Sequence, residues 1–182
     1  MRASLTVVAL SCTMAMACAQ PAPPEEALAV SEPTGDLGQV MQGIIFPNSN
    51  LIFDAQSTDP GAPPEERAGR GASANFGGMY SGWQGVENAA IALAESADLI
   101  MMPGRVCSNG TAVPVESEDW ITFTEVLREA GRATLVAAQA KDQDQVIEVT
   151  GQVAEACALC HEVYRDAGPA GSPERCVPAP PL

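Results

Sequence analysis

The stretch that decides the fold is Cys157-Ala158-Leu159-Cys160-His161, near the end of the last segment with helical periodicity. On a helix, residues three apart lie one above the other, so the Cys157 and Cys160 thiols share one face, and His161 follows about 100° further round. Two thiols and an imidazole in the order C-x-x-C-H are typical of covalent haem attachment. The pattern therefore predicts one covalent haem c held by Cys157 and Cys160, with His161 as the proximal iron ligand.

Three other interpretations of this motif stay open on the residues alone. A closed zinc site would need Cys107 and Cys176 as further ligands, because the chain has no second histidine. A thioredoxin-like redox pair would lie at the start of a helix in a βαβ unit, whereas this pair lies deep inside a helical pattern. A disulfide between Cys157 and Cys160 would be strained on a regular helix and would leave His161 unexplained.

Four segments repeat apolar residues at helical spacing and predict an all-α fold. They are Asp36–Phe46, Trp83–Met102, a segment that opens at Ser117 and ends at Lys141-Asp142, and Gln143–Asp166, which carries the motif. Thr34 and Asp36 are candidate caps of the first helix, Pro47 is expected to stop it, and a short apolar turn at Leu51–Phe53 follows. With only four Phe, two Trp and two Tyr in the chain, we expect a four-helix up-down bundle whose core a haem completes.

The remaining segments outline the domain organisation. Residues 20–33 are rich in Pro, Glu and Ala and predict a disordered linker. The haem domain is expected over 34–166, with insertions near 54–82 and 103–116, and the first is longer than connections inside compact domains usually are. Residues 167–182 are expected to form a Pro-rich tail.

Residues 1–19 predict an export signal. Arg2 supplies a positive start, and Leu5–Met16 is an apolar run too short to cross a bilayer. Small residues allow two cleavage sites, one after Ala19 and one of the lipoprotein type before Cys18, which would then carry lipid and tether the protein to a membrane. Both alternatives place the domain outside the cytoplasm, in the periplasm.

The charge balance restricts the partners. Nine Lys and Arg stand against 23 Asp and Glu, a formal net charge of −14. This charge excludes a nucleic-acid binder with a basic surface, and it would steer a redox partner protein with a basic surface towards the domain. The sequence also leaves open the formation of a homodimer.

The motif with the residues after it resembles the cytochrome c′ family, four-helix bundles whose C-terminal helix carries C-x-x-C-H with an aromatic and a basic residue just beyond. Tyr164 and Arg165 stand at those two positions here. The resemblance covers roughly Leu37–Arg165 without the two insertions, which depart from the family pattern, and it implies an up-down bundle around haem c. Val40-Met41 in the first helix is similar to the position of the distal methionine in low-spin relatives.

The sixth iron position decides the function that this resemblance implies. If Met41 binds iron, coordination changes little with redox state and the protein carries single electrons, which is the leading hypothesis; we do not expect an enzyme. If Met41 only packs in the core, the five-coordinate iron binds NO or CO, and the protein is a gas sensor or buffer. Met79, Met101 and Met102 are further candidates for the same position.

Two further features complete the predicted site. Arg165 lies one turn after His161 and is expected either to approach a haem propionate, to shield the imidazole, or to lie in solvent near the helix end. Of the six cysteines, Cys12 and Cys18 belong to the predicted export segment, so Cys107 and Cys176 are the thiols left in the mature domain after haem attachment. Each lies in a Pro- and Gly-rich segment at the same end of the expected up-down bundle. In an oxidising compartment we expect them to form a disulfide, the alternative being free or intermolecular thiols.

Overall fold

The computed structural model describes residues 32–62 and 81–177, all of which belong to one compact unit, Ser31–Leu182. The predicted export signal with Cys18, nearly all of the predicted linker, Met79 and residues 178–182 lie outside the described residues. Within the described ranges, no helix is long and apolar enough to cross a membrane.

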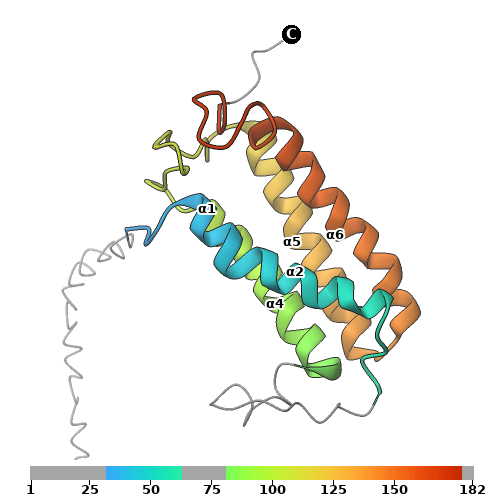
Figure 1. The fold of residues 1–182 in the computed structure, drawn as a ribbon. Coiled ribbons are helices and arrows are strands. Elements are labelled where there is room, and N and C mark those ends of the chain that lie inside the picture. The colour runs from blue at the N-terminus through green and yellow to red at the C-terminus, as the bar shows by residue number, and fades with distance from the viewer. Residues whose placement is uncertain (1–31, 63–80, 178–182) are drawn as a thin grey trace, which may run out of the picture. The chain divides into compact units, whose positions relative to one another are not determined.

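The described part of the chain is built from helices, as the sequence predicts (Figure 1). They are α1 (Leu37–Val40), the π-helical η1 (Met41–Ile45), α2 (Phe46–Phe53), the 3-10 turn η2 (Asp54–Gln56), α4 (Gly82–Ile100), α5 (Glu118–Gln139) and α6 (Gln143–Tyr164). Over residues 32–62 and 81–177 no strand forms, and Val106 and Ala112 make a single isolated bridge. The all-α prediction is confirmed, and the ends of α4, α5 and α6 fall within two residues of the predicted ends.

The first helix corrects one prediction, because Pro47 does not stop it. Residues Met41–Ile45 widen into a π-helical turn, in which the Phe46 N–H donates five residues back. A wider turn lets the proline ring avoid the carbonyl that it would meet in a regular α-helix. Asn48 Nδ2 donates to the Ile44 carbonyl at 2.7 Å and so satisfies an acceptor in this irregular turn. The apolar turn expected after the proline is the end of this same helical segment.

The helix ends follow the local sequence. Asp36, rather than Thr34, caps α1, through a capping box with Gln39 in which both hydrogen bonds measure 2.9 Å. Asp142 caps α6 by accepting from the Gln145 N–H at 3.0 Å. Between α5 and α6, Lys141 adopts a φ of 55°, a left-handed conformation that ends one helix directly before the next begins.

Small residues bring α4 and α5 close together. A Cβ on Gly131 would lie 2.7 Å from the Ala94 backbone nitrogen, so only glycine fits at this crossing. The helix α5 also packs on α6, and the first helical segment packs on α4 and α6. Most residues of the predicted apolar stripes are buried: Val86, Ala90, Leu93, Ala97 and Ile100 in α4, Trp120, Leu127, Ala130, Thr134 and Ala137 in α5, and Val146, Val153, Ala156 and Tyr164 in α6. The other three residues of these stripes are half-buried: Phe123, Val149 and Cys160.

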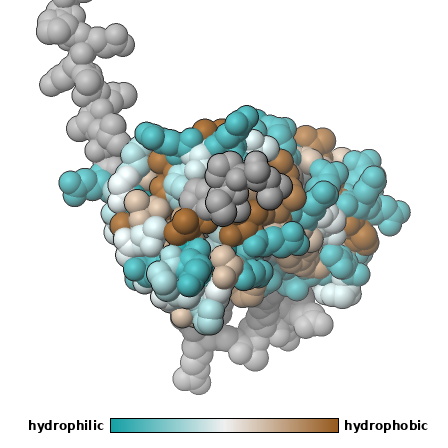
Figure 2. All heavy atoms as spheres, turned by 90° about the horizontal axis from the view of Figure 1, so that it is seen from above, coloured by the Kyte–Doolittle hydropathy of each residue, from teal (hydrophilic) through white to brown (hydrophobic). Residues whose placement is uncertain are grey.

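Two loops meet at the end of the helices where α4 and α6 finish. A disulfide joins Cys107 in the first loop to Cys176 in the segment after α6. The Cys176 N–H also donates to the Tyr164 carbonyl at 2.9 Å. Residues 167–177, expected as the start of a tail, are therefore folded back onto the helices. Figure 2 views this end and shows hydrophobic residues, in brown, exposed among hydrophilic ones.

Arg105 ties the start of the first helix to the end of α4. Its side chain is 3% exposed, and it donates from Nε to the Leu99 carbonyl at 3.0 Å and from Nη1 to the Gly35 carbonyl at 2.8 Å. The Leu37 N–H completes the junction by donating to the Val106 carbonyl at 2.8 Å. These hydrogen bonds fix the start of α1 against the loop that follows α4.

Candidate functional site

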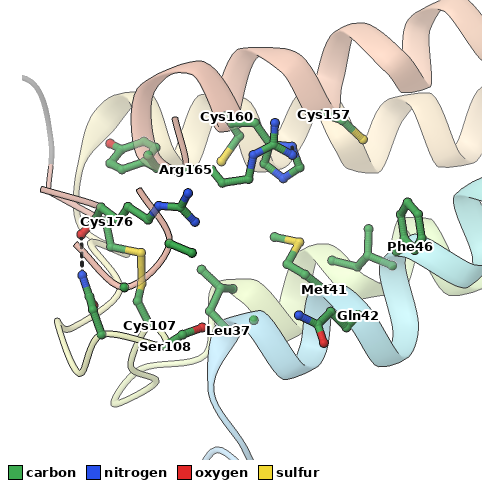
Figure 3. A pocket seen from close by; sticks show the side chains of 18 of the residues that line it. Leu37, Met41, Gln42, Phe46, Cys107, Ser108, Cys157, Cys160, Arg165 and Cys176 are labelled. Atoms are coloured by element: carbon green, nitrogen blue, oxygen red, sulfur yellow. Dashed lines mark hydrogen bonds between the residues drawn. A yellow bond between two sulfur atoms is a disulfide. The ribbon is translucent and has the colours of Figure 1, made fainter. Parts of the chain in front are cut away.

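Between the first helical segment and α6 lies a cavity of about 530 Å³ (Figure 3). Its walls are mostly apolar, with a few polar groups among them. They include Leu37, Met41, Ile45 and Phe46 on the first segment, Cys157, Cys160, His161 and Tyr164 on α6, and Cys107, Arg175 and Cys176 in the loops. Pockets that bind small ligands or cofactors are commonly about 300 to 1,000 Å³ in volume and have this kind of lining.

The two thiols of the motif are free and line this cavity together. Both side chains are half-buried. Burial raises the pKa of Cys157, against an opposing effect of Arg165, and burial together with Cys157 and Asp119 raises the pKa of Cys160 to about 12. Reactive dithiol enzymes need thiols with lowered pKa values, so the environment of this pair is unlike theirs.

His161 lines the same cavity and is neutral at pH 7. Its pKa is lowered by burial and by Arg165, against a weaker opposing effect of Asp166. Arg165 Nη1 lies 2.8 Å from His161 Nδ1, and because a guanidinium only donates, Nδ1 accepts and Nε2 carries the proton. A neutral imidazole is the form that binds metals. Metal binding through Nε2 would require the proton to leave that atom and Arg165 to release Nδ1.

Arg165 lies beside the imidazole of His161, the position needed to shield that ring. Its Nε and Nη2 donate to the two carboxylate oxygens of Asp166 at 2.6 Å and 3.0 Å. The side chain is 53% exposed, so the pair with Asp166 contributes little to stability.

Met41 lines the cavity from the side opposite α6 (Figure 3). It is the first residue of η1, and π-helical turns of this kind occur frequently at functional sites. Within the described residues, Met101 and Met102 are absent from the lining, and Met102 Sδ accepts from Arg105 Nη2 at 3.7 Å. Of the four methionines named from the sequence, Met41 is the one that the described structure brings to the motif.

Tyr164 and Trp120 fill the cavity wall beside Cys160. Their rings meet edge to face with centroids 4.8 Å apart. Tyr164 Oη donates to Asp119 Oδ1 at 2.6 Å, and the same oxygen accepts from the backbone N–H of Trp120 at 2.8 Å. Desolvation and the hydrogen bond to Asp119 raise the pKa of Tyr164, so the phenol stays protonated and holds the end of α6 against the start of α5.

The structure does not provide the ligands or the geometry that the zinc, dithiol and disulfide interpretations of the motif require. A closed zinc site needs Cys107 and Cys176, which are joined to each other. Over the described ranges, no three His, Cys, Asp or Glu side chains are grouped to hold a metal ion. Cys157 and Cys160 are not bonded to each other, and they lie in the last third of α6 rather than at its start.

The sequence missed the part of the site that follows α6. Arg175 and Asn109 line the cavity together with the disulfide, although residues 167–182 were expected to be a tail. The signal for this wall in the sequence is Cys176, because its bridge to Cys107 obliges the chain after α6 to fold back.

In comparisons with known proteins, no family model matches the chain, and no curated protein or solved structure is significantly similar to it.

Proposed function

We propose that this chain is an exported mono-haem c-type cytochrome that carries single electrons, rather than an enzyme. The supporting observation is that Cys157, Cys160 and His161 line one apolar cavity of about 530 Å³, with the thioether of Met41 on its opposite side. The donor set suits the group: two free thiols to bond it covalently, a neutral imidazole and a soft sulfur for its iron. When bound, haem supplies reversible one-electron chemistry.

Each residue of the site has a distinct task in this proposal. Cys157 and Cys160 would bond the porphyrin, and His161 and Met41 would supply ligands to its iron. The apolar walls exclude water. With iron ligands supplied by side chains that the fold holds in place, the bound group would change little between its redox states, which would favour electron transfer over ligand binding. Arg165 orients His161 until the imidazole is engaged.

The proposed fold is a four-helix up-down bundle that closes around the haem. The hydrogen bond from Tyr164 to Asp119 joins the end of α6 to the start of α5, as antiparallel neighbours require. The Cys107–Cys176 bridge links the ends that follow α4 and α6. A large planar group between the first segment and α6 would supply the volume that the alanine-rich helices do not.

The proposed location and partner come from the sequence. An exported domain, periplasmic and either released or tethered through lipidated Cys18, would meet its redox partner outside the cytoplasm. With a formal net charge of −14, it would associate most readily with a protein of basic surface.

An absorption spectrum of the full chain, produced together with haem-attachment machinery, tests this function. The proposal requires a low-spin spectrum with a weak far-red charge-transfer band in the oxidised form, the signature of methionine ligation. A high-spin spectrum that shifts on addition of CO or NO would contradict electron transfer as the function and would support gas binding instead. A colourless protein would contradict both functions.

A further inference from the structure

Arg175 differs from the other described arginines in how its guanidinium is satisfied. Arg128, Arg132 and Arg165 form ion pairs with carboxylates, and the buried Arg105 donates to backbone carbonyls. Arg175 donates from Nε to the Gly168 carbonyl at 2.8 Å, and among the described residues neither its Nη1 nor its Nη2 has a partner. The pKa of Asp166 is lowered chiefly by its hydrogen bond with Arg165 and in smaller part by the charge of Arg175, but the Arg175 and Asp166 side chains form no ion pair.

This half-buried side chain lines the cavity and is held there by its surroundings. Asn109 Nδ2 donates to the carbonyls of Ser172 and Arg175 at 2.8 Å and 3.1 Å. The next residue, Cys176, is fixed by the disulfide and by its hydrogen bond to the Tyr164 carbonyl. Because the backbone on both sides is anchored, Arg175 is presented to the cavity at little cost in conformational entropy.

The chemistry of an unpaired guanidinium in an apolar wall calls for an anion. Its two Nη groups form a fork that matches a carboxylate, and a charge-assisted pair is strengthened where water is excluded. A haem carries its two propionate carboxylates on the edge remote from the groups that bond cysteine. Figure 3 shows Cys157 at one end of the cavity and the Cys107–Cys176 disulfide, next to which Arg175 lies in the chain, at the other end.

We propose that Arg175, held by the disulfide-anchored segment after α6, binds a haem propionate and so fixes the outer edge of the cofactor. This inference rests on the proposed haem site. It assigns the propionate contact to Arg175 rather than to Arg165, whose Nε and Nη2 donate to Asp166.

The test uses the full-length holoprotein and resonance Raman spectroscopy, in which the propionate bending mode reports hydrogen bonding to that group. Arg175→Gln should shift this mode to lower frequency and lower the reduction potential, because a positive charge beside the haem favours the reduced state. Arg175→Lys keeps the charge without the fork and should give a smaller shift of the mode. Arg132→Gln removes a charge of the same sign from an exposed ion pair on α5, and should leave the mode in place.

The outcomes separate this inference from the haem assignment. Holoprotein whose propionate mode is the same in Arg175→Gln and the wild type would overturn the role of Arg175, even if the potential falls, and would leave haem attachment standing. If Arg175→Gln yields no holoprotein, an unchanged mode in Arg175→Lys would overturn it equally. A wild type without haem would instead overturn the proposed function itself.

Discussion

Tyr164 Oη donates to Asp119 Oδ1 at 2.6 Å and so connects the last residue of α6 to the first turn of α5. The phenol ring also packs edge to face on Trp120, which is 1% exposed. Tyr164, Trp120 and Cys160 all line the same cavity. The part of α6 that carries the motif is therefore held by one charged hydrogen bond and one aromatic contact.

Removing the Tyr164 hydroxyl should destabilise the protein. Tyr164→Phe keeps the ring on Trp120 and loses the hydrogen bond to a carboxylate, which should lower the free energy of unfolding by about 1 to 2 kcal/mol. Urea unfolding followed by circular dichroism measures the change. Asp119→Asn keeps an acceptor oxygen and should cost less. Equal stability of Tyr164→Phe and the wild type would show that the hydrogen bond contributes nothing.

The same contact predicts a loss of stability at alkaline pH. The pKa of Tyr164 is raised in the folded protein, first by desolvation and then by Asp119, so its folded-state pKa lies above the unfolded value of about 10. The stabilisation is fully present below about pH 10 and is lost as the pH rises through the folded-state pKa. The difference in unfolding free energy between wild type and Tyr164→Phe should shrink from pH 8 to pH 11; a constant difference would contradict the shift.

The crossing of α4 and α5 predicts opposite effects for two glycines. Gly131→Ala places a Cβ 2.7 Å from the Ala94 nitrogen and should destabilise by about 2 to 3 kcal/mol, because backbone must move. Gly151→Ala, in α6, meets nothing within 4 Å and should stabilise by about 0.5 to 1 kcal/mol. Thermal unfolding of both variants checks this pair, and a tolerated alanine at Gly131 would argue against the close packing of the two helices.

The Cys107–Cys176 bridge should account for a large share of the stability. Its sequence separation is 69 residues, for which the chain-entropy model gives about 4 kcal/mol. Urea unfolding of the Cys107→Ala/Cys176→Ala double variant should show a loss of that order. Alkylation of mature holoprotein without reductant, followed by intact-mass analysis, should add nothing; two alkyl groups would show both thiols free.

Replacing Met41 should change the spin state of the haem. Met41→Ala removes the sulfur that faces the motif, so a low-spin wild type should become high-spin and bind CO. Met101→Leu serves as the control, because that residue packs against the core and does not line the cavity. An unchanged spectrum of Met41→Ala would move the sixth ligand to another residue or leave the position vacant.

The helices were predictable because each carries its own signal. The stripe Val146, Val153, Ala156 and Tyr164 on α6 is buried as its spacing requires. The prediction that Pro47 ends the first helix was wrong, because the rule that proline ends a helix assumes regular α-helical geometry. Here the turn before Pro47 is π-helical. No pattern of spacing announces such a turn.

The motif could be recognised in the sequence because Cys157, Cys160 and His161 lie close together in the chain. The cavity wall formed by the loops depends instead on contacts between distant segments. Arg175 lies in a stretch whose Pro and Gly content suggests a tail, and only the long-range bond of Cys176 places it. The sequence allowed the hydrogen bond between Arg165 and His161 Nδ1 as one of several roles of Arg165, because residues four apart lie about one turn apart on a helix.

Acid-acetone extraction of the purified full-length protein, followed by a spectrum of the precipitated polypeptide and its intact mass, tests the central claim most directly. If Cys157 and Cys160 hold the haem through thioether bonds, the colour stays with the polypeptide, and the mass exceeds that of the mature chain by one haem. Cys157→Ser/Cys160→Ser should lose both signals. Haem that leaves the wild-type polypeptide in the acetone phase, or a colourless chain of unmodified mass, would contradict covalent attachment at these cysteines.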